Sequence, residues 1–455
     1  MLVTEKEITI ASPSGGDLIS SIEQSVAAQL ADDEIPVRFV VTDSSSDSFT
    51  CEVGVLSDPH FGFASRTQPI FDLNRRPWDN ANEFNIALLI PTGVGCEMGG
   101  HSGDGGAVAR LFGSICDNLI THPNVVNAAD VNELPDNGLY VEGSIITQLL
   151  MGTVGLRKVR SNRILMIVDE HHEPIFHEMA INSVSAARAA MGIDCPLVVQ
   201  LEKPAILRAL SSGSGRAVGR IECLEQICHV IEENLDDIDA VALSTLINLP
   251  GHFHADYFKP EAEEMVNPWG GVEAMLTHAL SSIYQIPTAH APMMNSSEVM
   301  NLDVGIVDPR KAAEAVSNTY LHCVLKGLHR APQLVAGLHP ESQSVLDATN
   351  ISCLVIPDGC LGLPLLAAIE QGIHVIAVRD RHCRMRNDLS ALPFSSNKLH
   401  YAENYLEAAG LVVALKAGVC VDAARRPLLP TKIKHSKFQE SHLANPVQEG
   451  SLEDR

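Results

Sequence analysis

A glycine-rich segment, Pro91 to Gly106, follows an apolar run and precedes a helical pattern. It reads PTGVGCEMGGHSGDGG and holds seven glycines. Glycine permits close backbone approach, and a helix N-terminus offers free N–H groups to an anion. The pattern predicts a cradle for phosphate or carboxylate, with ligand contacts at Gly93, Gly95, Gly99 and Gly100. A tightly packed loop without a ligand is the alternative, because the spacing fits neither the dinucleotide fingerprint nor the Walker loop.

Reactive side chains stand inside this loop. Cys96, His101 and Asp104 could each move a proton, and a nearby helix N-terminus would lower the pKa of the Cys96 thiol and make it a nucleophile or a base. Cys360, in IPDGCLGLP, follows a buried strand in the same way. Two thiols at strand ends are typical of cofactor-independent racemases. The alternative is that both are small buried residues.

A His-x-His pair ends another predicted strand, in LPGHFHAD. If the chain is extended there, His252 and His254 share one face and can bind one metal ion, with Asp256 or His290 as a further ligand. This predicts a divalent metal as the cofactor of a hydrolase or lyase. Histidines that contact substrate or solvent are the alternative.

The segment VDEHHEP, after the strand at 163–169, offers further acid–base groups. Asp169 and His171 are the candidates for proton transfer in this segment. A solvated loop is the alternative, because loops are polar for reasons unrelated to chemistry.

Ligand contacts are also predicted from an arginine cluster and a tryptophan. Arg379 and Arg381 begin the run RDRHCRMR, and arginine binds carboxylate and phosphate through two parallel hydrogen bonds. Pairing with nearby carboxylates is the alternative. Trp269, in NPWGGVEA, could stack on a ring or fill the core.

The elements that must position these groups alternate along the chain. Apolar runs typical of strands buried on both faces occur near 85–91, 163–169, 195–201, 239–249, 351–359 and 374–380, with helical patterns between them. This predicts an α/β, Rossmann-like, doubly wound and mostly parallel sheet, with a small N-terminal α+β lobe. The loops that begin at Gly93, Asp169, His252 and Asp358 should then meet at one sheet edge.

Four segments are predicted from these patterns and from the length of 455 residues. They are an N-terminal α+β lobe with its connector (1–82), an α/β domain with the glycine-rich loop (83–335), a C-terminal α/β segment packed on it (336–431) and a disordered tail (432–455).

Charge and cysteine usage limit the partners. A net charge of -24 argues against nucleic-acid and anionic-membrane surfaces, which need clustered Lys and Arg. Eleven scattered cysteines fit reduced thiols in the cytoplasm, and no apolar run reaches the ~18 residues that cross a bilayer. The expected partner is a small anionic metabolite, and a homo-oligomer is compatible with the sequence.

The motifs IPTGVGCEMGGHSGDGG, THPNVVNA, NPWGGVEA, TAHAPM and PDGCLGLPLLAAIEQG resemble a bacterial family of domain-of-unknown-function proteins, DUF3326. The resemblance spans roughly Phe84 to Gly418 and implies one integrated unit, with no catalytic role to carry over. The residues themselves predict an enzyme that binds a small anionic metabolite, with a phosphorylated metabolite as one option. A metal-dependent hydrolase or lyase, a two-thiol racemase or isomerase, and a non-catalytic ligand-binding protein are the alternatives.

Overall fold

The structure is a computed structural model, and it describes residues 1–13, 17–60, 62–101, 104–249, 253–259 and 265–435. Residues 1–413 form one compact unit, and residues 414–455 form another, which contains the end of α13 (Tyr405–Lys416) and α14 (Val421–Ala424). The expected boundaries after residues 82 and 335 fall inside the first unit. The tail expected to be disordered lies mostly outside the described residues.

One sheet of the first unit has six strands, and all its pairs are parallel. Its order is β21-β20-β18-β4-β5-β8. The strands are β4 (Asn85–Leu88), β5 (Asn118–Thr121), β8 (Gly138–Tyr140), β18 (Ile351–Pro357), β20 (His374–Val378) and β21 (Leu399–Ala402). Every residue of β4, β5 and β18 is buried, as their uninterrupted apolar runs predict.

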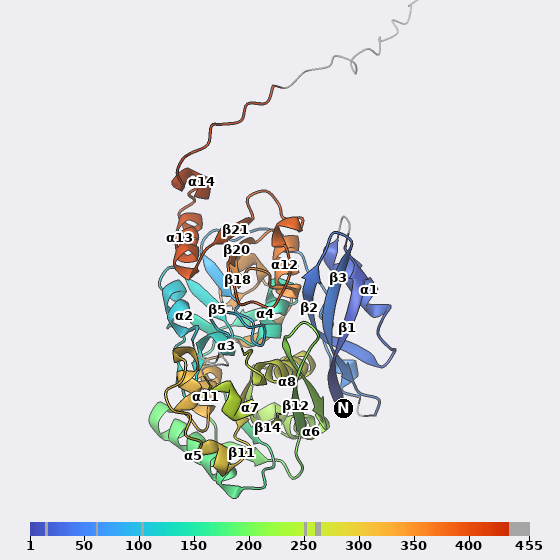
Figure 1. Cartoon of the computed structure of the whole chain (residues 1–455), viewed down its shortest axis with the longest axis vertical. Coiled ribbons are helices and arrows are strands. Elements are labelled where there is room, and N and C mark those ends of the chain that lie inside the picture. Colours follow the sequence, from blue (N-terminus) through green and yellow to red (C-terminus); the bar gives the residue numbers. More distant parts are fainter. Residues whose placement is uncertain (14–16, 61, 102–103, 250–252, 260–264, 436–455) are drawn as a thin grey trace, which may run out of the picture. The chain divides into compact units, whose positions relative to one another are not determined.

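Helices lie on both faces of this sheet. In Figure 1, α2 (Gly106–Gly113) and α13 lie on one side of the sheet, and α4 (Gly143–Leu150) and α12 (Leu363–Gln371) lie on the other. Phe112 of α2 packs edge-on against Tyr405 of α13, with ring centroids 6.4 Å apart. Gly372 ends α12 in a left-handed conformation, which glycine adopts without steric cost.

The second sheet has ten strands and is mixed. Its order is β11-β10-β14-β12-β13-β1-β3-β2-β19, and β15 also pairs with β14. β10, β11, β14 and β15 are parallel, whereas β1, β2, β3 and β13 pair antiparallel. The strands are β1 (Leu2–Ala11), β2 (Glu34–Ser44), β3 (Ser48–Ser57), β10 (Ile164–Val168), β11 (Leu197–Gln200), β12 (Ile206–Ser211), β13 (Ala217–Glu222), β14 (Ala240–Asn248), β15 (Thr288–Met293) and β19 (Leu361–Gly362).

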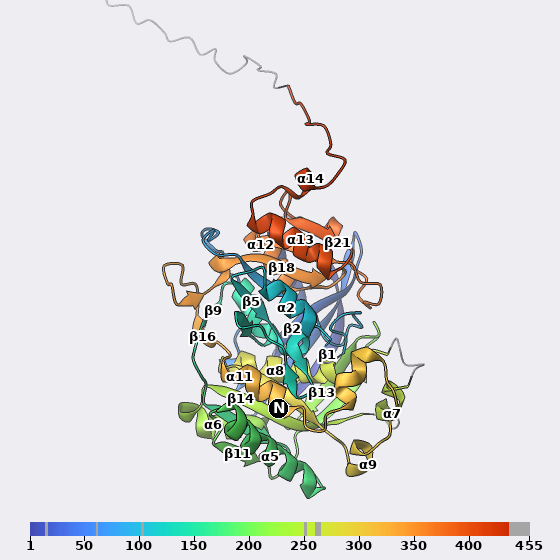
Figure 2. The ribbon, with the colours of Figure 1, turned by 90° about the vertical axis from the view of Figure 1, so that its left-hand side faces the viewer.

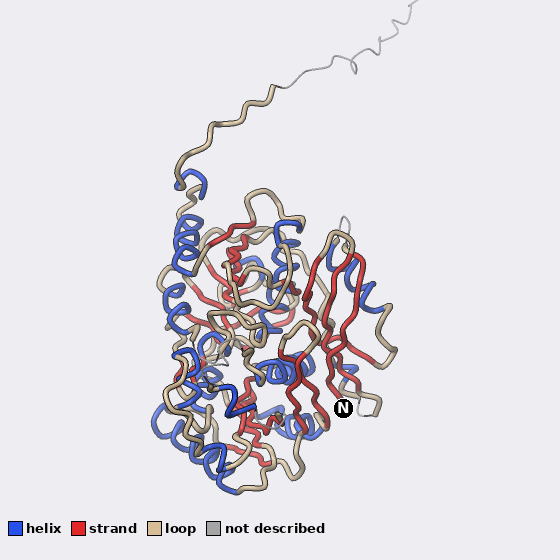
Figure 3. Tube along the Cα trace, in the orientation of Figure 1, coloured by secondary structure: helices blue, strands red, loops and turns tan. Residues whose placement is uncertain are grey.

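The α/β class is therefore confirmed, but the N-terminal strands do not form a sheet of their own. β1 pairs with β13, and this contact joins the N-terminal strands to the larger sheet. Figure 3 shows the strands of both sheets in red, and Figure 2 shows the first unit from the side. No helix among the described residues is long and apolar enough to span a bilayer.

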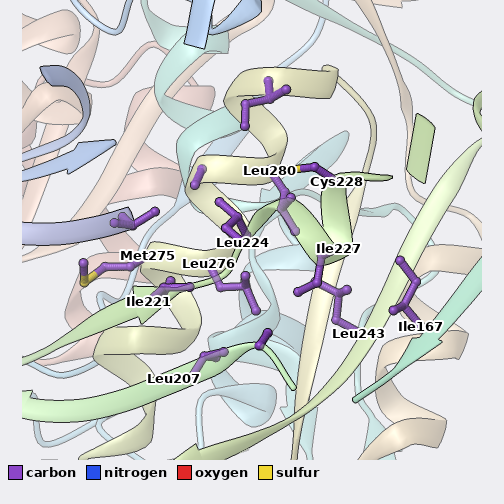
Figure 4. Close-up of a cluster of buried hydrophobic side chains, with 14 of the residues drawn as sticks. Ile167, Leu207, Ile221, Leu224, Ile227, Cys228, Leu243, Met275, Leu276 and Leu280 are labelled. Carbon is purple, nitrogen blue, oxygen red and sulfur yellow. The ribbon is translucent and has the colours of Figure 1, made fainter. Parts of the chain in front are cut away.

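A large aliphatic core lies against the ten-stranded sheet. Helices α6 (Glu225–Asn234) and α8 (Trp269–Tyr284) pack on β10, β12, β13 and β14, and Figure 4 shows Leu276 and Leu280 of α8 beside Ile227 of α6 and Leu243 of β14. Burying each such side chain contributes about 1.5–3 kcal/mol. α8 also contacts α4, so it bridges the two sheets.

The remaining elements are short or peripheral. A three-stranded sheet joins β16 (Gln333–Ala336), β9 (Val154–Arg157) and β17 (Val345–Leu346), and β6 (Asn127–Ala128) pairs with β7 (Val131–Asn132). The other helices are α1 (Leu18–Ala27), α3 (Pro123–Val126), α5 (Pro174–Met191), α7 (Phe253–Tyr257), α9 (Ser297–Met300), α10 (Ala312–Ala315) and α11 (Leu321–His329).

Candidate functional site

Three cysteines meet where three neighbouring parallel strands end. Cys96, Cys360 and Cys383 follow β4, β18 and β20, which are adjacent in the six-stranded sheet. The chain leaves β4 towards β5 and leaves β18 towards β20, so its direction across the sheet reverses between β4 and β18. Ligands of open α/β sheets bind outside the carboxyl ends of the strands at such a reversal.

The three sulfur atoms all lie within 4.8 Å of one another, and Sγ of Cys360 lies 3.7 Å from Sγ of Cys383. The Cys360 and Cys96 thiols donate to the Cys383 sulfur and lower the pKa of Cys383 to about 4, although burial opposes this. The pKa of Cys96 lies well above its usual range because of its hydrogen bonds with Cys360 and Cys383 and its burial. These directions oppose the predicted activation of Cys96 and favour Cys383 as the more acidic thiol of the trio.

Backbone contacts hold the three loops together. The Val94 carbonyl accepts from the Arg384 N–H at 2.8 Å, and the Gly359 carbonyl accepts from the Asn387 side chain at 2.7 Å. Gly95 has a φ of +76°, and a Cβ there would lie 3.2 Å from the His382 carbonyl oxygen. Glycine is required at this position to bring the first and third loops close enough for their sulfurs to meet.

The predicted glycine cradle is tightly packed. A Cβ at Gly100 would overlap the Cys96 carbonyl oxygen, and a Cβ at Gly99 would lie 2.5 Å from Ile90. The Gly99 N–H donates to Oδ1 of Asp104 at 2.5 Å. Oδ2 of Asp104 is buried without a hydrogen-bond partner among the described residues, and burial raises the pKa of this carboxyl to about 7.

A polar pocket of about 250 Å³ lies beside the thiols. Cys96, Cys383 and His101 line it together with Arg310, Arg381, Arg384 and Arg386, and Gly95 contributes to its wall. Nδ1 of His101 lies 2.6 Å from the Tyr257 hydroxyl, and burial lowers the pKa of His101 to about 4, so this imidazole is neutral at pH 7. We refer to this space as the arginine pocket.

Only one of the two predicted arginine contacts reaches the arginine pocket. Arg381 lines it. Arg379 is exposed, and its Nη1 lies 2.5 Å from Glu403.

A second, larger cavity of about 300 Å³ is lined by Cys360 and shares no lining residue with the arginine pocket. Its walls come from β2, α4, α8, β15 and the residues after β4 and β18, so it lies between the two sheets. Trp269 lines it and packs edge-on against Tyr257, with centroids 5.2 Å apart. We refer to this space as the inter-sheet cavity.

The predicted pair Asp169 and His171 is occupied by backbone hydrogen bonds. Asp169 accepts from the N–H groups of Glu170, Ala205 and Leu246 at 3.0–3.3 Å, although burial raises its pKa to about 6. His171 accepts from the Glu173 N–H at 3.0 Å, and its Nε2 lies 3.1 Å from the Met294 carbonyl oxygen. Neither residue lines the arginine pocket or the inter-sheet cavity.

The predicted strand before the His-x-His pair is present as β14, but the extended conformation that the pair needs is absent from the described part of the segment. Residues 253–257 form the helix α7, whereas alternate residues share a face only in a strand. His252 lies outside the described residues. Asp256 contacts Lys259 at 2.5 Å, and His290 lies between Glu273 (Nδ1, 3.0 Å) and the Thr245 hydroxyl (Nε2, 2.8 Å).

The single sheet edge predicted for all four loops is also wrong. β4 and β18 belong to the six-stranded sheet, whereas β10 and β14 belong to the ten-stranded sheet. The chain runs through two sheets, so the two pairs of strand ends lie on separate edges.

Cys383 is not predicted as a site residue from the sequence, because the run RDRHCRMR in which it stands indicates an anion-binding arginine cluster more strongly than a reactive thiol. Its position after an apolar strand was the available signal, since Cys96 and Cys360 follow strands in the same way. Arg38, Glu142 and His278 of the inter-sheet cavity carried no such signal, because their strand and helices bring them together only in three dimensions.

Residues 85–425 match the family described as "Protein of unknown function (DUF3326)", and the chain belongs to this family. The chain is also similar to an uncharacterised lipoprotein of Synechococcus sp. (strain ATCC 27144 / PCC 6301 / SAUG 1402/1). The identity is 30% over 338 residues, which cover 73% of this chain and 90% of the relative. No solved structure matches the chain.

Proposed function

We propose that Cys96, Cys360 and Cys383 bind a single thiophilic metal ion, and that the chain is a metal-dependent enzyme acting on a small anionic metabolite in the arginine pocket. The observation that carries this proposal is the meeting of three sulfur atoms within 4.8 Å of one another at a reversal of strand order. Thiolate is the ligand that zinc and other soft ions prefer.

The spacing of the sulfurs favours one ion. A tetrahedral zinc ion with Zn–S bonds of about 2.3 Å holds its sulfur ligands about 3.8 Å apart. The Cys360–Cys383 distance of 3.7 Å fits this geometry. An iron–sulfur cluster needs more widely spread cysteines, because each thiolate binds a different iron atom.

The same spacing weighs against the two-thiol racemase. A carbon held between two thiols needs about 3–3.5 Å to each, and therefore about 6–7 Å between the sulfurs. Cys96 and Cys360 lie within 4.8 Å of each other. The racemase remains an alternative only if the loops separate on binding substrate.

Three protein ligands and an adjoining pocket are typical of a catalytic site, because a structural zinc ion normally has four protein ligands. The metal would supply Lewis acidity and lower the pKa of a bound water. Arg381, Arg384 and Arg386 would orient an anionic substrate, since guanidinium groups match carboxylate and phosphate. His101, neutral at pH 7, is a buried group at the pocket wall that could accept a proton.

We also propose that the six-stranded parallel sheet is a Rossmann-like doubly wound sheet. In chain order, the strands of the parallel sheet run 6-5-4-1-2-3, which is the order of a Rossmann-like doubly wound sheet read from its other edge. Helices on both faces support this assignment. We propose that residues 141–350 are an insertion between the third and fourth strands.

The test is metal content by elemental analysis of protein purified under reducing conditions. We expect about one zinc per chain in wild type, almost none in Cys383→Ser, and no change in Cys223→Ser, a half-buried cysteine that serves as control. Cobalt substitution should give thiolate-to-metal absorption that Cys383→Ser abolishes. Metal-free wild type overturns the proposal. Metal retained in Cys383→Ser but lost in His252→Ala/His254→Ala would transfer the site to the histidines.

The thiols also bear on localisation. All the cysteines are free, and a trio of close thiols oxidises readily outside a reducing compartment, which supports the cytoplasm. The name of the Synechococcus relative instead implies a lipid-anchored protein. Fractionation of the native organism's membranes and cytoplasm, followed by immunodetection of the chain, separates the two.

A further inference from the structure

The inter-sheet cavity is a second space whose walls and polar groups define a ligand. Its walls are largely apolar and include Phe39, Ile70, Leu89, Ile356 and Leu361. A volume of about 300 Å³ is in the range of sites for small organic molecules. Water alone is a poor occupant of apolar walls, so the polar groups in the cavity are the informative ones.

Arg38 of β2 lines this cavity, and one of its guanidinium nitrogens is left without a hydrogen bond. Its Nη1 is buried without a hydrogen-bond partner among the residues that the structure describes, and the nearest carboxylate oxygen, on Glu5, is 3.9 Å away. Burial and the charge of Arg216 lower the pKa of Arg38 to about 10, so it remains a cation at pH 7. A buried guanidinium without hydrogen bonds is costly unless a ligand completes them.

Neighbouring Arg216 also lines the cavity and also leaves its Nη1 without a hydrogen-bond partner among the described residues, but its other guanidinium nitrogens are closely paired. Its guanidinium contacts both Glu5 and Glu52, and Nε lies 2.7 Å from Oε2 of Glu52. Arg216 is therefore closely paired, whereas Arg38 Nη1 stands 3.9 Å from Oε2 of Glu5, and neither atom has a hydrogen-bond partner among the described residues.

Two further donors face the same space. Nε2 of His122 accepts from the Ile90 N–H at 3.1 Å, and burial lowers the pKa of His122 to about 4. The neutral ring must then carry its proton on Nδ1, from which it can donate. Nε2 of Gln148 is buried without a hydrogen-bond partner among the described residues. Both residues line the cavity.

The carboxylates of the cavity wall are already taken. Glu142 lies 2.8 Å from Nδ1 of His278, and Glu273 lies 3.0 Å from Nδ1 of His290. Glu314 accepts from the Asn267 side chain at 3.1 Å. The cavity thus offers unsatisfied donors and a cation, but its acceptors are engaged.

We propose that the inter-sheet cavity binds a small organic acid with an apolar body, whose carboxylate is held by Arg38 with His122 and Gln148 as further donors. This site is separate from the arginine pocket, which is polar and shares no lining residue with it. It does not require the metal ion, because none of these three side chains belongs to the trio.

Trp269 offers a direct test. It lines the cavity, and Trp78 is the other tryptophan of the chain, so Trp78→Phe leaves Trp269 as the sole reporter. Octanoate should change Trp269 fluorescence saturably, with one molecule per chain and at least tenfold higher affinity than octan-1-ol, which has the same apolar chain without the charge. Equal affinity for the two probes, or no saturable change with octanoate, overturns the proposal without any variant of the site.

Arg38→Met removes the charge, and Arg208→Met, at an exposed arginine of β12, is the matched control. We expect Arg38→Met to weaken octanoate at least tenfold and to leave octan-1-ol unchanged, whereas Arg208→Met changes neither. Undiminished octanoate affinity in a folded Arg38→Met protein overturns the role of Arg38. Octanoate binding should persist in Cys383→Ser, so failure of this proposal and failure of the metal proposal are separate results.

Discussion

The direction of strand order reverses at two places in the first unit. One of these places is filled by the protein chain, and the other stays open. One lies between β4 and β18 of the six-stranded sheet. The other lies between β10 and β14 of the larger sheet, where the chain leaves β10 towards β11 and leaves β14 towards β15. Both are positions at which open α/β sheets bind ligands, and both carry a buried carboxyl, Asp104 at the first and Asp169 at the second.

The reversal at β10 is filled by the protein itself. Asp169 accepts backbone N–H groups from Glu170, Ala205 and Leu246, and β12 begins directly after Ala205 and pairs with Ile247 of β14. The chain therefore occupies the space beyond β10. The reversal at β4 stays open, with the Gly99 N–H on Asp104, three thiols and the arginine pocket. Polar residues at a strand end indicate a site only where the protein leaves them unsatisfied.

The largest effect that we expect is a loss of folding stability when the Asp169 carboxyl is removed. Asp169→Ala leaves three backbone N–H groups without their acceptor, and each unsatisfied buried donor costs about 1–3 kcal/mol. The free energy of unfolding should fall by about 3 kcal/mol or more in chemical denaturation. Asp169→Asn, which keeps one acceptor oxygen, should lose less. A loss below about 1 kcal/mol for Asp169→Ala would contradict the filled reversal.

A smaller effect, a gain in folding stability, is expected when Asp104 is replaced by Asn. Burial raises its pKa from 3.8 to about 7, so the folded protein binds this proton more tightly than the unfolded chain, and its stability falls as pH rises from about 4 to about 7. Asp104→Asn lacks this titration and still accepts from Gly99. We expect it to exceed wild type by about 1–3 kcal/mol at pH 8 and to equal it near pH 4.

The measurement for Asp104 is denaturant unfolding at several pH values. Asp136→Asn, at an exposed aspartate, should follow the wild-type curve throughout. A stability difference between Asp104→Asn and wild type that does not change with pH would show that the carboxyl does not titrate in this window.

The smallest effect concerns two arginines that are two positions apart. Arg381 lines the arginine pocket, whereas Arg379 is exposed and pairs with Glu403. Arg381→Ala should weaken phosphate or citrate binding about tenfold in calorimetry, because a hydrogen bond to a charged group is worth about 1.5–3 kcal/mol and exposure reduces this. Arg379→Ala should stay within twofold. Equal losses in both variants would place the anion outside the pocket.

Much of the sheet architecture is readable from the sequence. Uninterrupted apolar runs predict β4, β18 and β20, because a strand covered on both faces has no polar side. The same runs predict that Cys96 and Cys360 stand at strand ends. The strand expected near 239–249 is present as β14, whereas the segment that carries His254 is a helix and not extended, because a segment of a few residues carries too little periodicity to distinguish the two.

The sequence by itself determined the α/β class, the buried strands and the family, because these depend on local pattern and on motifs that stand together in the chain. Only the tertiary structure decided which strand ends become neighbours. Residues 96, 360 and 383 are distant along the chain, and the pairing of β18 with both β4 and β20 brings their sulfurs together. The same packing filled the space beyond Asp169, and no local pattern records whether a distant strand will occupy a site.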